Sequence, residues 1–167
     1  LTRIYGYELL MAPYSVAHLK IGLALSQTGY RFADGQRLNI FLTNTLQQPA
    51  PLAKWLPDFL SQETQSVNHV KKNIRFTVII GNPPYSVSSR NKSEYIEEMM
   101  KLYKEGLDEK NINPLSDDYI KFIRFGQSMI ERSHLGILAF VTNNSFIDGI
   151  IHRLMRKSLL ESFGEIF

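Results

Sequence analysis

The chain has 167 residues, 44% of them hydrophobic and 21% charged, which is ordinary for one folded domain with a sizeable core. Cysteine is absent, which excludes disulfides, thiolate catalysis and cysteine-ligated metal centres. The formal net charge of +3 is mildly favourable for a polyanionic partner but does not by itself indicate one. The four histidines form no metal-binding spacing, and no apolar run approaches the roughly 18 residues of a membrane span. We therefore expect a protein without a metal centre or membrane segment, located in the cytoplasm.

The first half of the chain predicts two strands separated by a helix. Residues 3–8 form a short strand, and residues 13–27 carry apolar side chains at helical spacing. Residues 38–42 form a second, apolar strand. Residues 46–73 contain three prolines and many amides, so we interpret them as a long connection with one short helix near Trp55.

The second half continues the alternation. Residues 76–80 form a continuous apolar run, as expected for a parallel strand covered on both faces. The further elements predicted are a charged helix at 93–105, a polar loop at 106–114, a helix capped by Ser116 or Asp117, a strand at 136–142, a basic amphipathic helix at 149–162, and the start of a strand at 165–167.

This alternation of strands and helices predicts an α/β domain with a mainly parallel sheet and helices on both faces. In such sheets, ligands bind beyond the carboxyl ends of the strands. The segment IIGNPPYS, residues 79–86, lies at one of those ends. A plain turn would explain Asn-Pro alone, since both residues favour turns. A buried-type strand before it and an aromatic residue after it favour a functional corner.

The corner offers a specific chemistry. The side-chain carbonyl of Asn82 and the main-chain carbonyl of Pro83 are two neutral acceptors, and the rings of Pro83 and Pro84 hold the backbone stiff. Two such acceptors suit an exocyclic amino group, which has two protons to donate. Accepting both makes the nitrogen a better nucleophile, and Tyr85 supplies a flat face for the ring that bears the amine. An adenine N6 is the obvious candidate.

Asn-Pro-Pro-Tyr after an apolar strand resembles the catalytic motif of N6-adenine DNA methyltransferases that use S-adenosylmethionine. Protein-glutamine and some RNA methyltransferases carry the same four residues. Four longer segments resemble the methyltransferase part of the Type ISP single-polypeptide restriction-modification enzymes: YGYELLMAPYSVAHLKIGL, RLNIFLTNTL, YKEGLDEKNINPLSDDYIKFIRFGQSMIE and GILAFVTNNSFIDG. The resemblance implies a Rossmann-like methyltransferase fold and a double-stranded DNA substrate whose target base leaves the helix.

The resemblance also implies roles for individual residues. Asn82, Pro83, Pro84 and Tyr85 would form the catalytic corner. Three further residues would bind S-adenosylmethionine: Glu8 at the ribose hydroxyls, Asn44 at the adenine amino group in place of the usual aspartate, and Phe122 against the adenine ring. The alternatives are a solvated glutamate for Glu8 and an ordinary core position for Phe122.

The loop after the corner remains open to two interpretations. Arg90 and Lys92, within residues 86–92, would contact DNA phosphate, or the loop is simply solvated.

One element of the resembled family is missing. No Gly-x-Gly turn, which cradles the methionine part of the cofactor, occurs in the chain. We therefore expect residues 1–167 to be the central part of a methyltransferase catalytic domain, incomplete because its first strand and glycine turn are missing. Nuclease, ATPase and target-recognition domains would belong to the same parent chain. The alternative functions are a protein-glutamine or RNA methyltransferase, or a non-catalytic DNA-contacting fragment.

Overall fold

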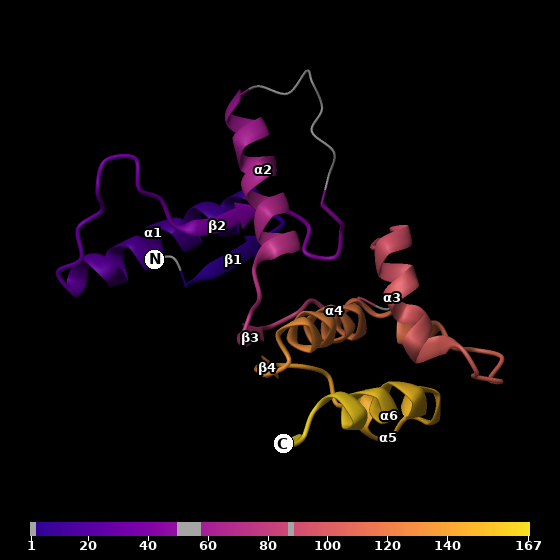
Figure 1. Ribbon diagram of the computed structural model, residues 1–167. Coiled ribbons are helices and arrows are strands. Elements are labelled where there is room, and N and C mark those ends of the chain that lie inside the picture. Colours follow the sequence, from indigo (N-terminus) through magenta and orange to yellow (C-terminus); the bar gives the residue numbers. More distant parts are fainter. Residues whose placement is uncertain (1–2, 50–57, 87–88) are drawn as a thin grey trace. The chain divides into compact units, whose positions relative to one another are not determined.

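The computed structural model describes residues 3–49, 58–86 and 89–167. The chain divides into two compact units, Leu1–Lys72 and Asn73–Phe167, and each unit is described by itself. Among the described residues, each unit contains one pair of parallel strands, which Figure 1 labels β1 to β4. Parallel strands need a crossover connection, which explains why helical segments separate the two strands of each pair.

In the first unit, β1 (Tyr5–Glu8) pairs in parallel with β2 (Asn39–Leu42). Helix α1 (Met11–Gln27) connects the two strands and contacts both, and α2 (Asp58–Asn73) follows β2. The buried apolar side chains of this unit come from β2, its flanking residues and α2: Leu38, Ile40, Phe41, Leu46, Val67 and Val70.

In the second unit, β3 (Val78–Gly81) pairs in parallel with β4 (Ile137–Phe140). The elements around them are α3 (Glu94–Lys104), the 3-10 helix η1 (Asn113–Ser116), α4 (Asp118–Ser133), α5 (Ser145–Asp148), the 3-10 helix η2 (Ile150–His152) and α6 (Arg153–Ser162).

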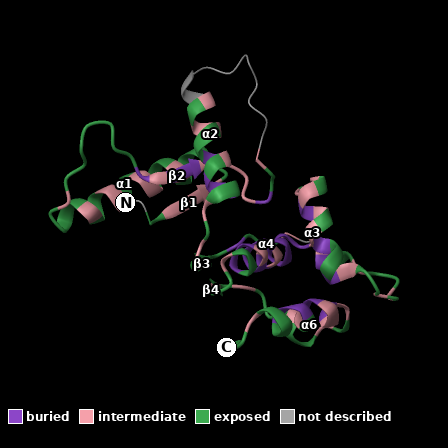
Figure 2. Ribbon diagram, in the orientation of Figure 1, coloured by how far each residue is buried: buried purple, intermediate pink, exposed green. Residues whose placement is uncertain are grey.

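Helix α4 is the centre of the second unit. Most of its residues are buried, as the purple ribbon in Figure 2 shows, and it contacts α3, α6 and both strands. Its apolar side chains meet those of α3 and α6 in one core, made of Ile96, Met100, Tyr103, Ile120, Ile123, Phe125, Met129, Ile130, Met155 and Leu159. The helix also approaches the sheet closely, because a Cβ on Gly126 would lie only 2.6 Å from Cδ1 of Leu138.

The parallel pairing expected from the sequence is confirmed, but the strands form two separate pairs. The sequence predicts that the strand near residues 76–80 is covered on both faces, and within this unit α4 covers one of them. Ile79 is half-buried and pairs with Leu138 on the face that α4 covers, whereas Val78 and Ile80 are 56% and 76% exposed on the other face. Side chains of a strand alternate between its faces, and the second unit supplies a helix to only one of them.

Two predictions about helices and strands are wrong. Residues 46–73 are not mainly a long connection, because α2 occupies sixteen of them, and Trp55 lies outside the described residues. The few apolar residues of α2 concealed its periodicity. Residues 165–167 do not begin a strand in the described structure. None of the described helices is long and apolar enough to cross a bilayer.

Candidate active site

The corner begins where the ladder between β3 and β4 ends. The carbonyl of Gly81 accepts the last bond, from the N–H of Val141 at 3.1 Å. Pro83 and Pro84 have no N–H to donate, so the strand cannot extend further. A Cβ on Gly81 would lie 3.1 Å from Cε1 of Phe140. Glycine therefore lets the Phe140 ring pack against the strand end, just before the corner.

The two acceptors of the corner accept no hydrogen bond from the part of the chain that the structure describes. Asn82 is exposed, and its side chain makes no hydrogen bond to any residue that the structure describes. The carbonyl of Pro83 accepts none from the described residues either, although the residue itself is buried. Pro84 is exposed. The corner thus keeps two hydrogen-bond acceptors unpaired on a backbone that the prolines stiffen.

Tyr85 lies beside these acceptors with half of its side chain exposed. Its hydroxyl donates to the carbonyl of Val141 at 3.1 Å, which holds the ring near the end of β4. Its ring centroid lies 5.8 Å from that of Tyr119, at an interplanar angle of 59°. The exposed fraction of Tyr85 is 52%, so a flat face remains available to a planar ligand.

Tyr119 extends the aromatic surface inward from the first turn of α4. Its hydroxyl is 2.9 Å from Oγ of Ser145, and its ring centroid is 6.4 Å from that of Phe146. Burial raises the pKa of Tyr119, so the hydroxyl stays protonated at neutral pH. The sequence places Tyr119 on an ordinary apolar helix face, and nothing in its spacing distinguishes it from core.

The backbone after the corner is tied to the start of α4. Asp117, the N-cap of that helix, accepts from the N–H of Ser86 at 2.8 Å and from the N–H of Tyr119 at 3.4 Å. In return, the carbonyl of Ser86 accepts from the N–H of Asp118 at 3.3 Å. A capping carboxylate thus satisfies one free donor of the helix and one of the loop.

A buried polar cluster binds Ser89 and Asn91, which follow the corner in the chain. Oδ1 of Asp118 accepts from Oγ of Ser89 at 2.6 Å and from Nδ2 of Asn91 at 2.9 Å. The side chain of Lys121 is fully buried and donates to Ser89 Oγ at 3.2 Å, to the Asn91 carbonyl, and to Glu97 Oε1 at 3.0 Å. We call these five residues the Lys121 cluster. A buried ammonium is tolerated only when acceptors surround it, as they do here.

Glu97 is the acidic partner of Lys121 in this cluster. Partial burial acts to raise the pKa of Glu97, but hydrogen bonds from Lys121 and Lys104 outweigh it and hold the pKa below its usual value. Glu97 therefore remains ionised at neutral pH and balances Lys121. In the sequence, the lysine resembles any solvated charge on a helix, because its partners are 24 to 32 residues away.

Glu8 and Asn44 lie at the carboxyl edge of the strand pair in the first unit. Glu8 ends β1, and its carbonyl accepts from the N–H of Thr43 just after β2, at 2.7 Å. Oε1 of Glu8 accepts from the N–H groups of Leu9 at 2.8 Å and Leu10 at 3.1 Å. The carboxylate thus caps its own loop with one oxygen, while its other oxygen accepts no hydrogen bond from the described residues.

Asn44 lies in a turn whose main-chain carbonyls accept hydrogen bonds from a buried lysine. Its Oδ1 accepts from the N–H of Leu46 at 2.9 Å. Nζ of Lys71, on α2, donates to the carbonyls of Asn44 at 2.7 Å and Gln47 at 2.9 Å. Burial lowers the pKa of Lys71 to about 8, and the sequence gives no signal for this contact.

Phe122 belongs to α4 of the second unit and is half-buried there. The structure therefore brings Glu8 and Asn44 to one strand edge, and the corner to Tyr119. Phe122 lies in the second unit, which is described by itself.

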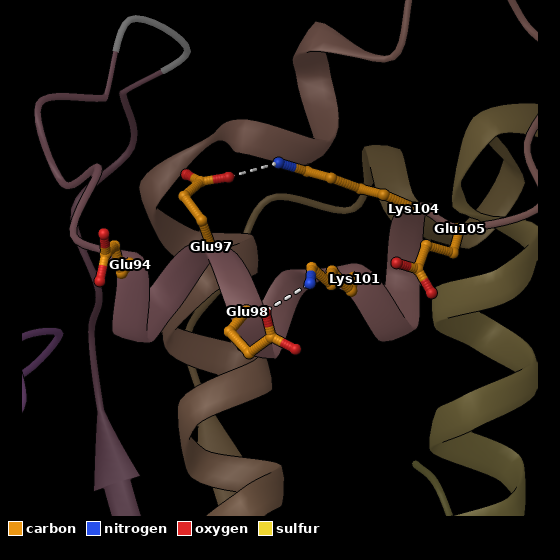
Figure 3. Close-up of a pocket in the computed structure, with 6 residues that line it drawn as sticks. All are labelled: Glu94, Glu97, Glu98, Lys101, Lys104 and Glu105. Carbon is orange, nitrogen blue, oxygen red and sulfur yellow. Dashed lines mark hydrogen bonds and ion pairs between the residues drawn. The ribbon is translucent and has the colours of Figure 1, made fainter.

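A hollow of about 420 Å³ lies on α3 and contains none of the predicted site residues. Figure 3 shows its charged lining, with Glu97 paired to Lys104 at 3.1 Å and Glu98 to Lys101 at 2.5 Å. Because these charges are paired along one open helix face, we interpret the hollow as solvated surface. The described residues contain no group of three or more side chains suited to a metal ion.

A known protein family matches most of the chain. The family model described as Eco57I restriction-modification methylase matches residues 3–164. A search of curated proteins finds no match.

Three solved structures are similar over nearly the whole chain. The ATP-dependent Type ISP restriction-modification enzyme LlaBIII bound to DNA has 28% identity and a TM-score of 0.77, and the match covers 94% of this chain and 11% of that one. The DrdV–DNA complex has 29% identity and a TM-score of 0.75, covering 95% and 16%. A nuclease-deletion mutant of the Type ISP enzyme LlaGI with a DNA substrate mimic has 23% identity and a TM-score of 0.76, covering 95% and 14%. The chain thus spans a small part of each of these proteins.

Proposed function

The chain belongs to the Eco57I restriction-modification methylase family, and on this basis we propose that it methylates the N6 amino group of adenine in double-stranded DNA. The observation that carries the proposal is the pair of unused acceptors at the corner. An asparagine oxygen and a proline carbonyl that accept no hydrogen bond from the described residues suit a ligand that brings two N–H protons.

The corner acts on the amine through hydrogen bonds. When Asn82 and Pro83 accept both amino protons, the nitrogen lone pair is drawn away from the adenine ring and toward an incoming methyl group. The stiff backbone orients the acceptors before the substrate arrives, which lowers the entropic cost of the reaction. No side chain with a tuned pKa is required, because the amine loses a proton to solvent after its new bond to carbon has formed.

The target adenine has to leave the duplex to reach this corner. Removing a base from the stack costs a few kcal/mol, which stacking on an aromatic side chain offsets. The exposed face of Tyr85 would take the base, and Tyr119 would hold the Tyr85 ring from behind.

S-adenosylmethionine would supply an electrophilic methyl group to this reaction: as the bond from the amine nitrogen to the methyl carbon forms, the bond from that carbon to the sulfonium sulfur would break, and a neutral thioether would leave. The residues of the first unit fit such a ligand, since Glu8 has one carboxylate oxygen that no described residue uses, at a strand end where vicinal hydroxyls can donate to it. Asn44 would accept from the adenine amino group of the cofactor. Phe122 would pack against the adenine ring.

The similar structures with 28% and 29% identity are both complexes with DNA, which supports a DNA substrate. The small share of those chains that this one covers supports a larger parent protein, in which nuclease, ATPase and target-recognition domains accompany the methyltransferase.

A methyl-transfer assay with tritiated S-adenosylmethionine, run on the larger parent protein, tests the proposal. Unmodified duplex DNA, total RNA and a protein mixture are supplied in parallel, and the DNA product is digested to nucleosides for identification. We expect label in DNA alone, as N6-methyladenine. Label confined to RNA or to glutamine in protein would replace the DNA substrate by one of the alternatives, and no label in any sample would contradict the proposed activity.

A further inference from the structure

We infer that Arg90 and Lys92 form a phosphate-binding pair, which holds the DNA backbone beside the base that is being methylated. The inference deepens the proposed DNA methyltransferase function and rests on it. It assigns a substrate contact to the loop after the corner, outside the four catalytic residues.

The first support is the alternating burial of the loop. Ser89 is buried and Asn91 half-buried, whereas Arg90 and Lys92 are exposed. The side chains of Ser89 and Asn91 are both bound by Asp118, and Ser89 Oγ and the Asn91 carbonyl by Lys121. The Lys121 cluster thus holds two residues inward, and their neighbours are directed to solvent.

The second support is that the two cations are not neutralised within the protein. Neither makes a hydrogen bond or ion pair with a residue that the structure describes, and this includes Glu94, two positions after Lys92. Acidic side chains also lie at this loop: Asp117 accepts from the N–H of Ser86, and Asp118 and Glu97 belong to the Lys121 cluster. The pair therefore contributes two positive charges that have no ion-pair partner among the described residues.

The third support is that hydrogen bonds hold the residues next to Arg90 and Lys92 in place. A flexible basic segment loses conformational freedom when it binds, whereas here the Lys121 cluster holds Ser89 and Asn91, the sequence neighbours of Arg90 and Lys92. Arginine presents a planar set of donors that matches two phosphate oxygens, and lysine acts as a point charge. A backbone contact of this kind positions the duplex without reading its sequence.

The test measures DNA affinity as a function of salt for the full chain and for the double variant Arg90→Gln/Lys92→Gln. Fluorescence anisotropy with a labelled unmethylated duplex gives the slope of log affinity against log salt. Each lost phosphate contact lowers that slope by about 0.9, so we expect a reduction of about 1.8 in the double variant. The affinity for S-adenosylmethionine should not change.

The matched control is Arg75→Gln/Lys110→Gln, which removes the same two charges elsewhere. Both residues are exposed, and Arg75 precedes β3 at the end opposite the corner. The charge-retaining variant Arg90→Lys/Lys92→Arg should keep most of the wild-type slope. Equal slopes for the test and control double variants would overturn the inference.

The failure of this inference is distinguishable from that of the proposed function. If the wild-type chain methylates DNA while the slope of the Arg90/Lys92 variant equals that of the control, only the phosphate-binding pair is wrong. If the wild-type chain methylates no DNA, the proposed function itself fails, and the phosphate-binding pair fails with it.

Discussion

Tyr85 serves two purposes that can be separated by substitution. Its hydroxyl anchors it to Val141, and its exposed ring is the proposed platform for the base. Stacking of a base on an aromatic side chain contributes about 1–3 kcal/mol, so Tyr85→Ala should weaken binding of flipped DNA by roughly 10- to 100-fold. Tyr85→Phe keeps the ring and loses one hydrogen bond of about 1 kcal/mol, and should keep most of the activity.

This prediction is checked by measuring kcat and KM for duplex DNA with both variants. Equal losses in Tyr85→Phe and Tyr85→Ala would mean that the hydroxyl matters and the ring does not. That result would contradict stacking on Tyr85.

His152 makes stability depend on pH. It is 4% exposed and neither ring nitrogen has a hydrogen-bond partner among the described residues. Burial, aided by the nearby charge of Arg156, lowers the pKa of His152 below its ordinary value of 6.5. The unfolded chain therefore takes up this proton at a higher pH than the folded chain does, and folding stability falls as pH decreases below about 7.

The measurement is chemical denaturation of the wild type and His152→Gln between pH 8 and pH 5. Above pH 7 the imidazole is neutral in both states and contributes no slope. We expect a loss of stability toward acid that is clearly smaller in the variant. Identical pH dependence in the two proteins would show that His152 is not the titrating group.

At the scale of elements, Asp117 connects the corner to α4. Asp117→Ala removes the N-cap and leaves the N–H of Ser86 without its partner, which should cost about 1–2 kcal/mol. Asp117→Asn keeps an acceptor oxygen and should cost clearly less. The free energies of unfolding of both variants, followed by circular dichroism, check this expectation. An alanine variant as stable as the wild type would contradict the capping role.

The elements differ in how well the sequence predicts them. Helix α4 has a strong apolar periodicity and a capping aspartate, and its predicted start agrees with the structure. Helix α2 has few apolar residues, so composition alone suggested a connection. For β3, the apolar run identified a strand but not what covers it, because coverage depends on helices far away in the chain.

The candidate site, too, could be predicted from the sequence only in part. The corner could be predicted because Asn, Pro and Tyr form a local pattern with a definite chemistry. Lys121 and Lys71 could not, since each is a single charge on a helix whose acceptors lie 24 or more residues earlier. Only the folded chain shows that both are buried, and that Lys121 orders the loop that follows the corner.

At the scale of the whole molecule, the proposed roles divide between two units. The first unit carries Glu8 and Asn44 at the edge of one parallel pair, and the second carries the corner at the edge of another. The family match covers both units, at residues 3–164, which supports their joint use in one methyltransferase.

The central claim is that the oxygens of Asn82 and Pro83 activate an adenine amine. The most direct measurement compares N6-methyladenine formation by the wild type and by Asn82→Ala in the full chain, together with cofactor affinity by calorimetry. Because the alanine removes one acceptor and breaks no hydrogen bond to a described residue, we expect kcat to fall by about 100- to 1,000-fold, similar to the loss of one oxyanion-hole donor, while cofactor affinity stays unchanged. An Asn82→Ala variant that methylates adenine at the wild-type rate would contradict the claim.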